Sequence, residues 1–163
     1  MPQFIMTVGL PYSGKSYYTK THPTLSSYTR VSSDDEVMEL ARLCGSSYNE
    51  VFEAKIGQAM ELAEKRFLGA LRGSESILLD QTNLTRASRS RKLALVPDSY
   101  TKGCIYCPPP CEEELQRRMV ERKSHIIPAE VLERMRYLHE EPKLDEGFDW
   151  LYVAGFDDII LNG

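Results

Sequence analysis

An octapeptide near the N-terminus, GLPYSGKS at residues 9–16, constrains the fold of this 163-residue chain more than any other feature. It follows the apolar stretch Gln3–Val8 and precedes a stretch with a helical pattern, Lys15–Thr21. The octapeptide fits G-x-x-x-x-G-K-[ST], a loop whose backbone N–H groups surround a phosphate at the N-terminus of a helix. This strand–loop–helix context predicts a P-loop, and therefore a chain that binds ATP or GTP.

Two side chains of the predicted loop carry its chemistry. Lys15 is expected to reach the β- and γ-phosphates of the nucleotide, and the Ser16 hydroxyl is expected to bind Mg²⁺. The glycines leave the backbone N–H groups uncovered, so that these groups can point at the phosphates. The loop residues predicted to contact the nucleotide are Gly9, Pro11, Ser13, Gly14, Lys15 and Ser16.

Apolar, β-branched runs alternate with longer amphipathic stretches, which predicts a parallel sheet covered by helices on both faces. The expected strands are Gln3–Val8, Tyr28–Ser32, Ser76–Leu79, Lys102–Cys107 and Trp150–Ala154. The expected helices are Lys15–Thr21, Asp35–Leu43, Tyr48–Arg72, Arg86–Leu95, Glu112–Arg122 and Ala129–Glu140. Because no repeat or long linker interrupts this pattern, we expect one α/β domain over residues 1–163, with a parallel five-stranded sheet.

The overall charge argues against a broadly basic surface. The chain has 20 lysines and arginines against 24 acidic residues, a net charge of −4, and a pI near 5.5. A nucleic-acid partner would therefore have to be held by a local basic patch. No apolar run approaches the roughly 18 residues of a membrane span, and no signal-peptide pattern is present, so we expect a cytoplasmic protein with no membrane partner.

Three of the four cysteines, Cys104, Cys107 and Cys111, lie close together. A zinc site is one interpretation, but structural zinc sites usually combine two cysteine pairs, and the nearest later histidine, His125, is distant. We favour thiols buried on a strand, followed by a proline-rich turn and a helix that starts near Cys111.

Two adjacent carboxylates, Asp34 and Asp35, follow the second expected strand. In an open parallel sheet the ligand crevice lies at the carboxyl ends of the strands, so these residues should face the phosphate site. One of them could instead cap the next helix. We favour Asp34 as a general base that takes a proton from an attacking hydroxyl, and we expect Asp35 to contact the substrate.

The segment DQTNLTRASRSRK begins with Asp80, at the end of the third expected strand. Asp80 would hold Mg²⁺ through water or orient the substrate. Thr82 and Asn83 offer a hydroxyl and an amide at the same edge of the sheet, and we count both among the substrate-binding residues.

The next helix is rich in basic residues, namely Arg86, Arg89, Arg91 and Lys92. Such a basic face is often only solvated. Its place beside the expected site, in an acidic chain, favours contacts with phosphates of a second substrate, with Arg86 and Arg89 as the candidate contacts.

A second basic segment is EEELQRRMVERKSHIIP, in which Arg118 and Arg122 are four residues apart and share a helix face. Phosphoryl transfer needs positive charge over the γ-phosphate, and an arginine on a mobile segment can supply it. Surface pairs with neighbouring glutamates are the alternative. We expect Arg122 to be catalytic and Arg118 to contact the nucleotide.

Together these motifs resemble the kinase domain of the polynucleotide kinases. The matching segments, in the same order over nearly the whole chain, are GLPYSGKS, SSDD, DQTNLTRASRSRK, RRMVERKSHIIP and EEPKLDEGFDWLYV. The resemblance implies a P-loop kinase fold with a helical lid at about residues 112–140. It also implies that ATP and Mg²⁺ are required, and that the γ-phosphate passes to a hydroxyl, most simply the 5′-OH of a DNA or RNA end.

The resemblance places site residues as well. It puts Asp34 at the general base of the family, Lys15 and Ser16 at its P-loop pair, Asp80 at its D-x-T-N aspartate and Arg122 at its transition-state arginine. The segment EGFD resembles the closing strand of the family and implies that Phe148 packs near the nucleotide.

One position departs from the phage members of the family, because Val37 stands where they have an arginine that grips the 3′ phosphate of the substrate. The resemblance extends to wider relatives that phosphorylate other alcohols, and the acidic pI keeps two of their acceptors as alternatives: a hydroxymethylated base in DNA and a small nucleoside-like alcohol. A hypothesis of another class is a nucleotide-gated binding protein that performs no transfer.

Overall fold

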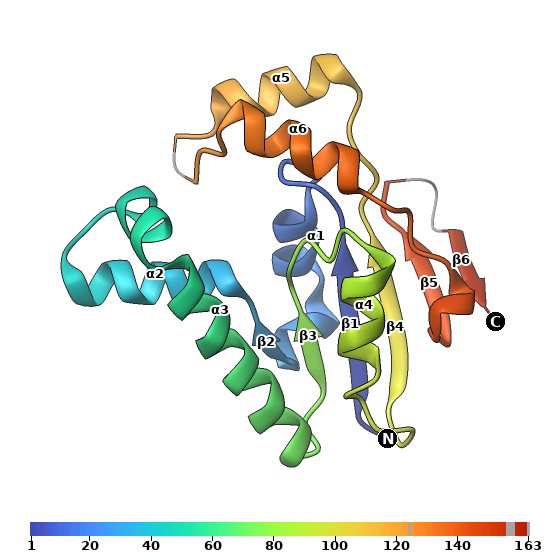
Figure 1. Cartoon of the computed structure of the whole chain (residues 1–163). Coiled ribbons are helices and arrows are strands. Elements are labelled where there is room, and N and C mark those ends of the chain that lie inside the picture. The colour runs from blue at the N-terminus through green and yellow to red at the C-terminus, as the bar shows by residue number, and fades with distance from the viewer. Residues whose placement is uncertain (124, 156–158, 163) are drawn as a thin grey trace.

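A six-stranded sheet forms the centre of the molecule, in the order β2-β3-β1-β4-β5-β6 (Figure 1). The computed structural model describes residues 1–123, 125–155 and 159–162. Five neighbouring strands pair in parallel, and the sixth pairs antiparallel with β5. The strands are β1 (Gln3–Val8), β2 (Thr29–Val31), β3 (Ile77–Leu79), β4 (Thr101–Tyr106), β5 (Trp150–Val153) and β6 (Ile159–Asn162).

The parallel five-stranded sheet confirms the prediction, and each of its strands lies within one residue of the expected range. Strand β6 was not expected. It is only four residues long, and such a short apolar run carries too little periodicity to be recognised. It adds one antiparallel strand at the edge beside β5.

The helices cover both faces of the sheet, as predicted (Figure 1). Alternate residues of β1 point to opposite faces, because side chains alternate along a strand. Phe4 and Met6 pack with Phe67 of α3, whereas Ile5 packs with Leu25 of η1. The helices are α1 (Lys15–Thr21), η1 (Pro23–Ser27), α2 (Ser33–Cys44), α3 (Tyr48–Arg72), α4 (Arg86–Leu93), α5 (Glu112–Glu121), α6 (Ala129–Leu138) and η2 (Leu144–Glu146).

Helices α2 and α3 form a hairpin at the β2 edge of the sheet. Gly45 ends α2 in the left-handed region, with φ 65°, and Ser47 begins α3 with a capping box that it forms with Glu50. Val37 and Val51 belong to the small apolar core between the two helices. Helix α3 bends at Lys55, whose φ and ψ are not helical.

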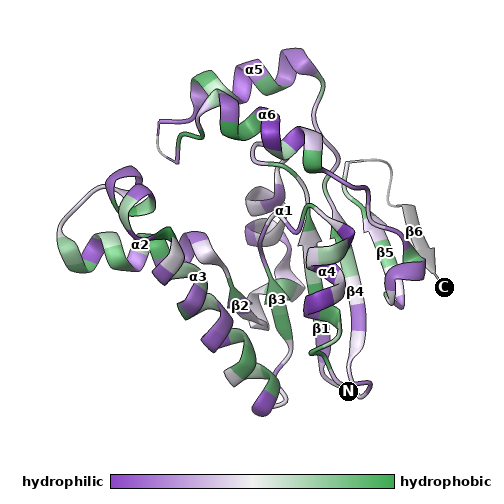
Figure 2. Cartoon of the chain, in the orientation of Figure 1, coloured by the Kyte–Doolittle hydropathy of each residue, from purple (hydrophilic) through white to green (hydrophobic). Residues whose placement is uncertain are grey.

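Helices α5 and α6 lie above the carboxyl ends of the central strands, where a lid was expected (Figure 1). Figure 2 shows that hydrophobic residues follow the central strands, whereas hydrophilic residues dominate the outer side of α5. Among the described residues, no helix combines the length and apolar character needed to cross a bilayer.

The cysteine cluster is built into β4 and the segment after it. Cys104 and Cys107 are buried, as expected for thiols on a strand, whereas Cys111 is exposed at the N-cap of α5. All four cysteines of the chain are free thiols. The described residues contain no group of three or more His, Cys, Asp or Glu side chains arranged to hold a metal ion.

Candidate functional site

A cavity of about 1080 Å³ lies at the carboxyl ends of the strands, under the lid. Its lining comes from the P-loop, the start of α2, the first half of α3, the segment 80–85, helix α4 and the lid. Ligand pockets for one drug-sized molecule are roughly 300–1,000 Å³ in volume. The cavity therefore lies just above the upper end of this range and has room for a nucleotide.

The P-loop backbone requires glycine at two positions for different reasons. A Cβ on Gly9 would lie 2.6 Å from the backbone oxygen of Cys107, so a side chain does not fit there. Gly14 has φ 95°, in the left-handed region that favours glycine. Pro11, Gly14, Lys15 and Ser16 line the cavity.

Gly9 and Ser13, two predicted nucleotide contacts, are not among the cavity-lining residues. Gly9 instead lies against β4, and its N–H donates to the backbone oxygen of Thr82 over 3.1 Å. The Ser13 hydroxyl is buried and has no hydrogen-bond partner in the described structure.

Lys15 is buried at the start of α1, and its ammonium donates to the backbone oxygen of Leu10 over 2.7 Å. Burial lowers the pKa of Lys15 to about 8, although the negative charges of Asp80 and Asp34 act in the opposite direction. The ammonium is therefore charged at pH 7. It lies close enough to both carboxylates for their fields to act on it, at the place where the P-loop would hold phosphates.

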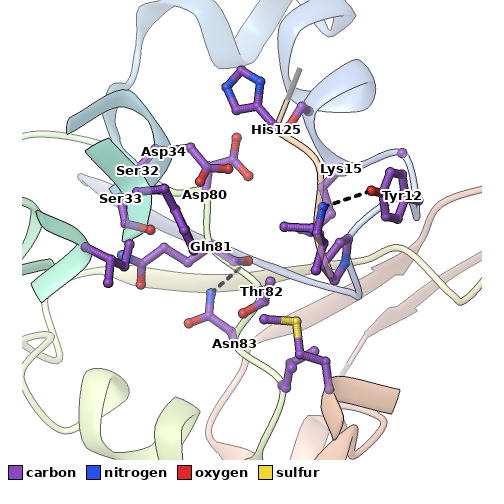
Figure 3. A pocket seen from close by; sticks show the side chains of 18 of the residues that line it. Tyr12, Lys15, Ser32, Ser33, Asp34, Asp80, Gln81, Thr82, Asn83 and His125 are labelled. Carbon is purple, nitrogen blue, oxygen red and sulfur yellow. Dashed lines mark hydrogen bonds between the residues drawn. The ribbon is translucent and has the colours of Figure 1, made fainter. Parts of the chain in front are cut away.

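Asp34 lies in the first turn of α2 and points into the cavity, where Figure 3 shows it near Asp80 and Lys15. The hydroxyl of Tyr48 donates a 2.6 Å hydrogen bond to Oδ1 of Asp34. Burial, and then this hydrogen bond, raise the pKa of Tyr48, so the phenol keeps its proton. The ring of His125 lies over Tyr48, with 3.7 Å between ring centroids. Asp34 is thus exposed to the cavity, and the Tyr48 hydroxyl holds its carboxylate on one side.

Asp35 has a different environment from its neighbour. The guanidinium of Arg30 pairs with Asp35 at 2.6 Å and with Asp80 at 2.7 Å, and Asp35 does not line the cavity. The expectation that one of the two aspartates caps α2 is wrong. Ser32 is the N-cap, and its hydroxyl accepts from the Asp35 N–H.

Asp80 is buried at the end of β3 and lines the cavity. Its Oδ1 accepts from Thr7 Oγ1, and its Oδ2 accepts from Thr19 Oγ1 and from Arg30. These partners fix the carboxylate in place. Mg²⁺ usually binds one or two protein oxygens, several waters and substrate phosphates. The hydroxyl of Ser16, with Asp80 acting through water, fits that mode of binding.

Thr82 and Asn83 both line the cavity, but Asn83 is largely engaged by the fold. Its side-chain NH₂ donates to the backbone oxygen of Thr7 over 2.8 Å, and its Oδ1 accepts from Lys92. Asn83 is buried and has φ 46°, a left-handed value that asparagine tolerates better than most residues. Its observed contacts hold the segment after β3 against β1.

Arg86 and Arg89, the arginines expected to contact the substrate, do not line the cavity. Arg89 is completely buried, and its Nε and Nη2 donate to the carboxylate of Glu146 over 2.6 and 2.8 Å. Arg86 pairs with Asp145 at 3.2 Å. The prediction for Arg89 is wrong, because its guanidinium is buried in an ion pair that ties α4 to η2.

The other two basic residues of α4, Arg91 and Lys92, do line the cavity. The ammonium of Lys92 donates to Oε1 of Gln81 over 2.6 Å, and burial lowers its pKa to about 8. The basic helix thus reaches the site through its last turn rather than its first.

The lid arginines meet the P-loop through Tyr12. Nη1 of Arg118 donates to the backbone oxygen of Tyr12 over 2.7 Å, and Cζ of Arg122 lies 5.0 Å from the centre of the Tyr12 ring. The Tyr12 ring is buried with Leu115 and Leu132, and its hydroxyl accepts from the N–H of Ile127 over 3.3 Å. Both arginines line the cavity.

Two residues that the family resemblance singled out do not lie at the site. Phe148 is buried in the main core and does not line the cavity, and β5 begins at Trp150, so EGFD precedes the strand. Val37 is fully buried between α2 and α3 and cannot face a substrate.

The main site residues that sequence reasoning missed are Tyr12, Arg30, Tyr48 and His125. Arg30 and His125 give no motif signal. Tyr48 does, because it starts a series of apolar residues spaced by four, and Tyr12 could have been noticed as a large side chain inside a phosphate-binding loop.

Residues 4–142 match a family model, AAA_33, described as an AAA domain. The chain belongs to this family. The match covers the P-loop, the carboxylates after β2 and β3, and the whole lid. The match ends before β5 and β6, which lie outside the matched residues.

Several solved structures resemble this AAA domain. A Chloroflexus aurantiacus protein to which kinase activity has been ascribed is 18% identical, with a TM-score of 0.66, over 94% of this chain and 84% of that one. A gluconokinase from Sinorhizobium meliloti is 16% identical, with a TM-score of 0.58, over 94% and 83%. A structure from the PezAT toxin–antitoxin system of Streptococcus pneumoniae is 14% identical, with a TM-score of 0.68, over 99% and 70%. The chain is a kinase-like P-loop domain, a fold that implies nucleotide binding.

Proposed function

We propose that this AAA domain is an ATP-dependent kinase that transfers the γ-phosphate to a hydroxyl of a nucleic acid, most simply the 5′-OH of a DNA or RNA end. The observation that carries the proposal is the charge of the cavity. Its described lining includes six basic side chains and three acidic ones, in a chain of net charge −4. Such a local basic patch is what an acidic protein needs to hold a polyanion.

The chain's residues suit an in-line phosphoryl transfer. Lys15 and the P-loop N–H groups would bind the β- and γ-phosphates, and Asp34 would accept the proton of the acceptor hydroxyl. The acceptor oxygen forms a bond to the γ-phosphorus, the bond from that phosphorus to the β–γ bridging oxygen breaks, and ADP leaves. Arg122 would stabilise the charge that spreads over the transferred group.

Magnesium would be held at Ser16 and, through water, at Asp80. When bound, the ion neutralises charge on the phosphates of the nucleotide. Arg30 has a supporting role in this scheme, because it fixes Asp80 and withdraws Asp35 from the cavity. The proposal therefore separates the two carboxylates, with Asp34 as the base and Asp35 as a partner of Arg30.

A small alcohol is the second candidate acceptor. It is favoured by the acidic net charge and by the likeness to a gluconokinase, although that likeness concerns the fold. A small acceptor would make few phosphate contacts, so its phosphorylation should depend only weakly on salt. A nucleic-acid end should show a strong salt dependence.

An acceptor screen with ATP and Mg²⁺ tests the proposal. The acceptors are 5′-OH DNA, 5′-OH RNA, end-blocked DNA with hydroxymethylated bases, nucleosides and gluconate, and the readout is ADP release together with labelled product. The Lys15→Ala variant is the control. Transfer to 5′-OH ends by the wild type but not by Lys15→Ala is the expected result, whereas transfer only to nucleosides or gluconate would contradict it.

A further inference from the structure

The first half of α3 presents an apolar face to the cavity. Tyr48, Phe52, Ile56 and Met60 are spaced by four residues, and all four line the cavity. Side chains four apart lie on one side of a helix, and although α3 bends at Lys55, the residues on both sides of the bend face the same cavity. The first three are half-buried, because they also pack on the core between α2 and α3, whereas Met60 is 59% exposed. The face thus continues that core into the cavity.

This apolar face begins at the candidate base. The Tyr48 hydroxyl is bonded to Asp34, and the rings of Tyr48 and Phe52 are stacked, with centroids 5.7 Å apart and 25° between planes. His125 covers Tyr48. Phe52 follows one helical turn after Tyr48, and Ile56 and Met60 continue the cavity lining beyond the bend at Lys55.

A second lining of the same cavity is cationic. Arg91 and Lys92 of α4 reach it, and Lys92 is held there by Gln81 and Asn83. A ligand that suits both linings has a flat apolar part and negative charge. A nucleotide has both, whereas a polyol lacks the apolar part and would leave the α3 face uncovered.

We propose that Phe52, Ile56 and Met60 form the binding surface for the base of the acceptor nucleotide whose 5′-OH meets Asp34. This inference rests on the proposed function and adds a specificity determinant to it: the terminal residue of the acceptor needs a base. Phe52 supplies the aromatic surface, and Ile56 and Met60 extend it. The surface reads the flat face of the base, so it tolerates all bases.

The kinetic test compares two oligonucleotides that differ only at the 5′-OH residue, one with a base and one with a tetrahydrofuran abasic unit. Stacking on an aromatic side chain is worth about 1–3 kcal/mol per base, which corresponds to about 5- to 150-fold in kcat/KM. The wild type should prefer the end with a base by a factor in that range. Equal use of the two ends would overturn the inference.

Two variants locate the preference on the protein. Phe52→Leu keeps an apolar side chain but removes the ring, so the preference should fall at least about threefold, a large part of the stacking energy. Leu62→Ala is the matched control, since Leu62 packs on the same core and does not line the cavity. It should keep the wild-type preference. A Phe52→Leu enzyme with the full preference would contradict the inference.

A second readout needs no variant and no turnover. The methyl resonances of Ile56 and Met60 in the wild type should shift on addition of a 5′-OH dinucleotide, and much less with its abasic analogue. Base-dependent shifts without transfer to any end would sink the kinase proposal and leave the base site standing. Transfer without base preference and without shifts would contradict the base site alone. If transfer, base preference and shifts are all absent, both the kinase proposal and the base site are wrong.

Discussion

At the scale of single residues, Asp34 and Asp35 are neighbours in sequence with different surroundings. Asp34 faces the cavity beside Tyr48, whereas Asp35 is paired with Arg30. The sequence placed both at the correct edge of the sheet, because carboxylates after a parallel strand meet the ligand crevice. The sequence could not predict that the two aspartates have different surroundings. That difference depends on Arg30 and Tyr48, which lie next to them only in the folded chain.

The variant Asp34→Asn should therefore lose turnover by roughly 10²–10⁴-fold, because the amide keeps the shape but cannot take a proton. ATP affinity should change little. Asp35→Asn breaks a half-exposed ion pair worth about 0–1 kcal/mol, so its turnover should fall by less than about tenfold. Turnover at saturating ATP measures both. An inactive Asp35→Asn beside an active Asp34→Asn would mean that the base is the other carboxylate.

The lowered pKa of Lys15 predicts that nucleotide binding depends on pH. Burial lowers its pKa to about 8, so it loses its charge as the pH rises through 8, whereas an ordinary lysine keeps it to about 10.5. Phosphates favour the charged form. Affinity for ATP should therefore be greatest below pH 8 and fall above it, by up to roughly tenfold per pH unit.

Calorimetric titration of ATP between pH 7 and pH 10 would measure this effect. Lys92 also has a pKa lowered to about 8 and lines the same cavity, so Lys92→Met serves as the control. The pH dependence should persist in Lys92→Met. If it disappears there, Lys92 and not Lys15 is the titrating group.

At the scale of elements, Arg89 connects α4 to the segment before β5. Its guanidinium pairs with Glu146 and also donates to the backbone oxygens of Asn83, Leu84 and Glu140. Periodicity correctly predicted the helix and its basic character. The sequence could not predict whether a given arginine points into the core or into the cavity, because buried and solvated ion pairs contain the same residue types.

Arg89→Met should lower the free energy of unfolding by about 3–5 kcal/mol, because it leaves a buried carboxylate without a partner. Arg86→Met is the matched control on the same helix. Its pair with Asp145 is half-exposed, so the cost should be below about 1 kcal/mol. Urea unfolding of both variants makes the comparison. Equal losses of unfolding free energy in the two variants would contradict the claim that the buried Arg89–Glu146 pair stabilises the fold.

The lid is attached to the P-loop by Tyr12, whose ring is buried under α5 and α6. Tyr12→Ala removes this contact without changing the demands on a backbone with φ 65°. Amides of α5 and α6 should then exchange with deuterium faster, while those of β1 stay protected. Tyr137→Ala, at an 89% exposed position of α6, should leave exchange unchanged. Unaltered lid exchange in Tyr12→Ala would contradict the attachment.

At the scale of the whole molecule, the sequence predicted the layered α/β architecture, the single parallel sheet and the lid. The architecture and the sheet depend on local periodicity and on the P-loop motif, which have strong signals, whereas the lid was implied by the family resemblance. The sixth strand and the inner arrangement of the cavity depend on contacts between distant segments. The basic lining illustrates the difference: its residue types were foreseen, but Arg91 and Lys92 take the places expected for Arg86 and Arg89.

The central claim is that this cavity moves a γ-phosphate onto a 5′-OH end. The most direct measurement incubates the protein with γ-labelled ATP, Mg²⁺ and a 5′-OH oligonucleotide, then digests the product to nucleoside 5′-monophosphates. The same oligonucleotide with a 5′-phosphate is the control. The account predicts label only in the terminal nucleotide of the 5′-OH strand, and none with the control. Label found solely as inorganic phosphate, or equally in both strands, would contradict it.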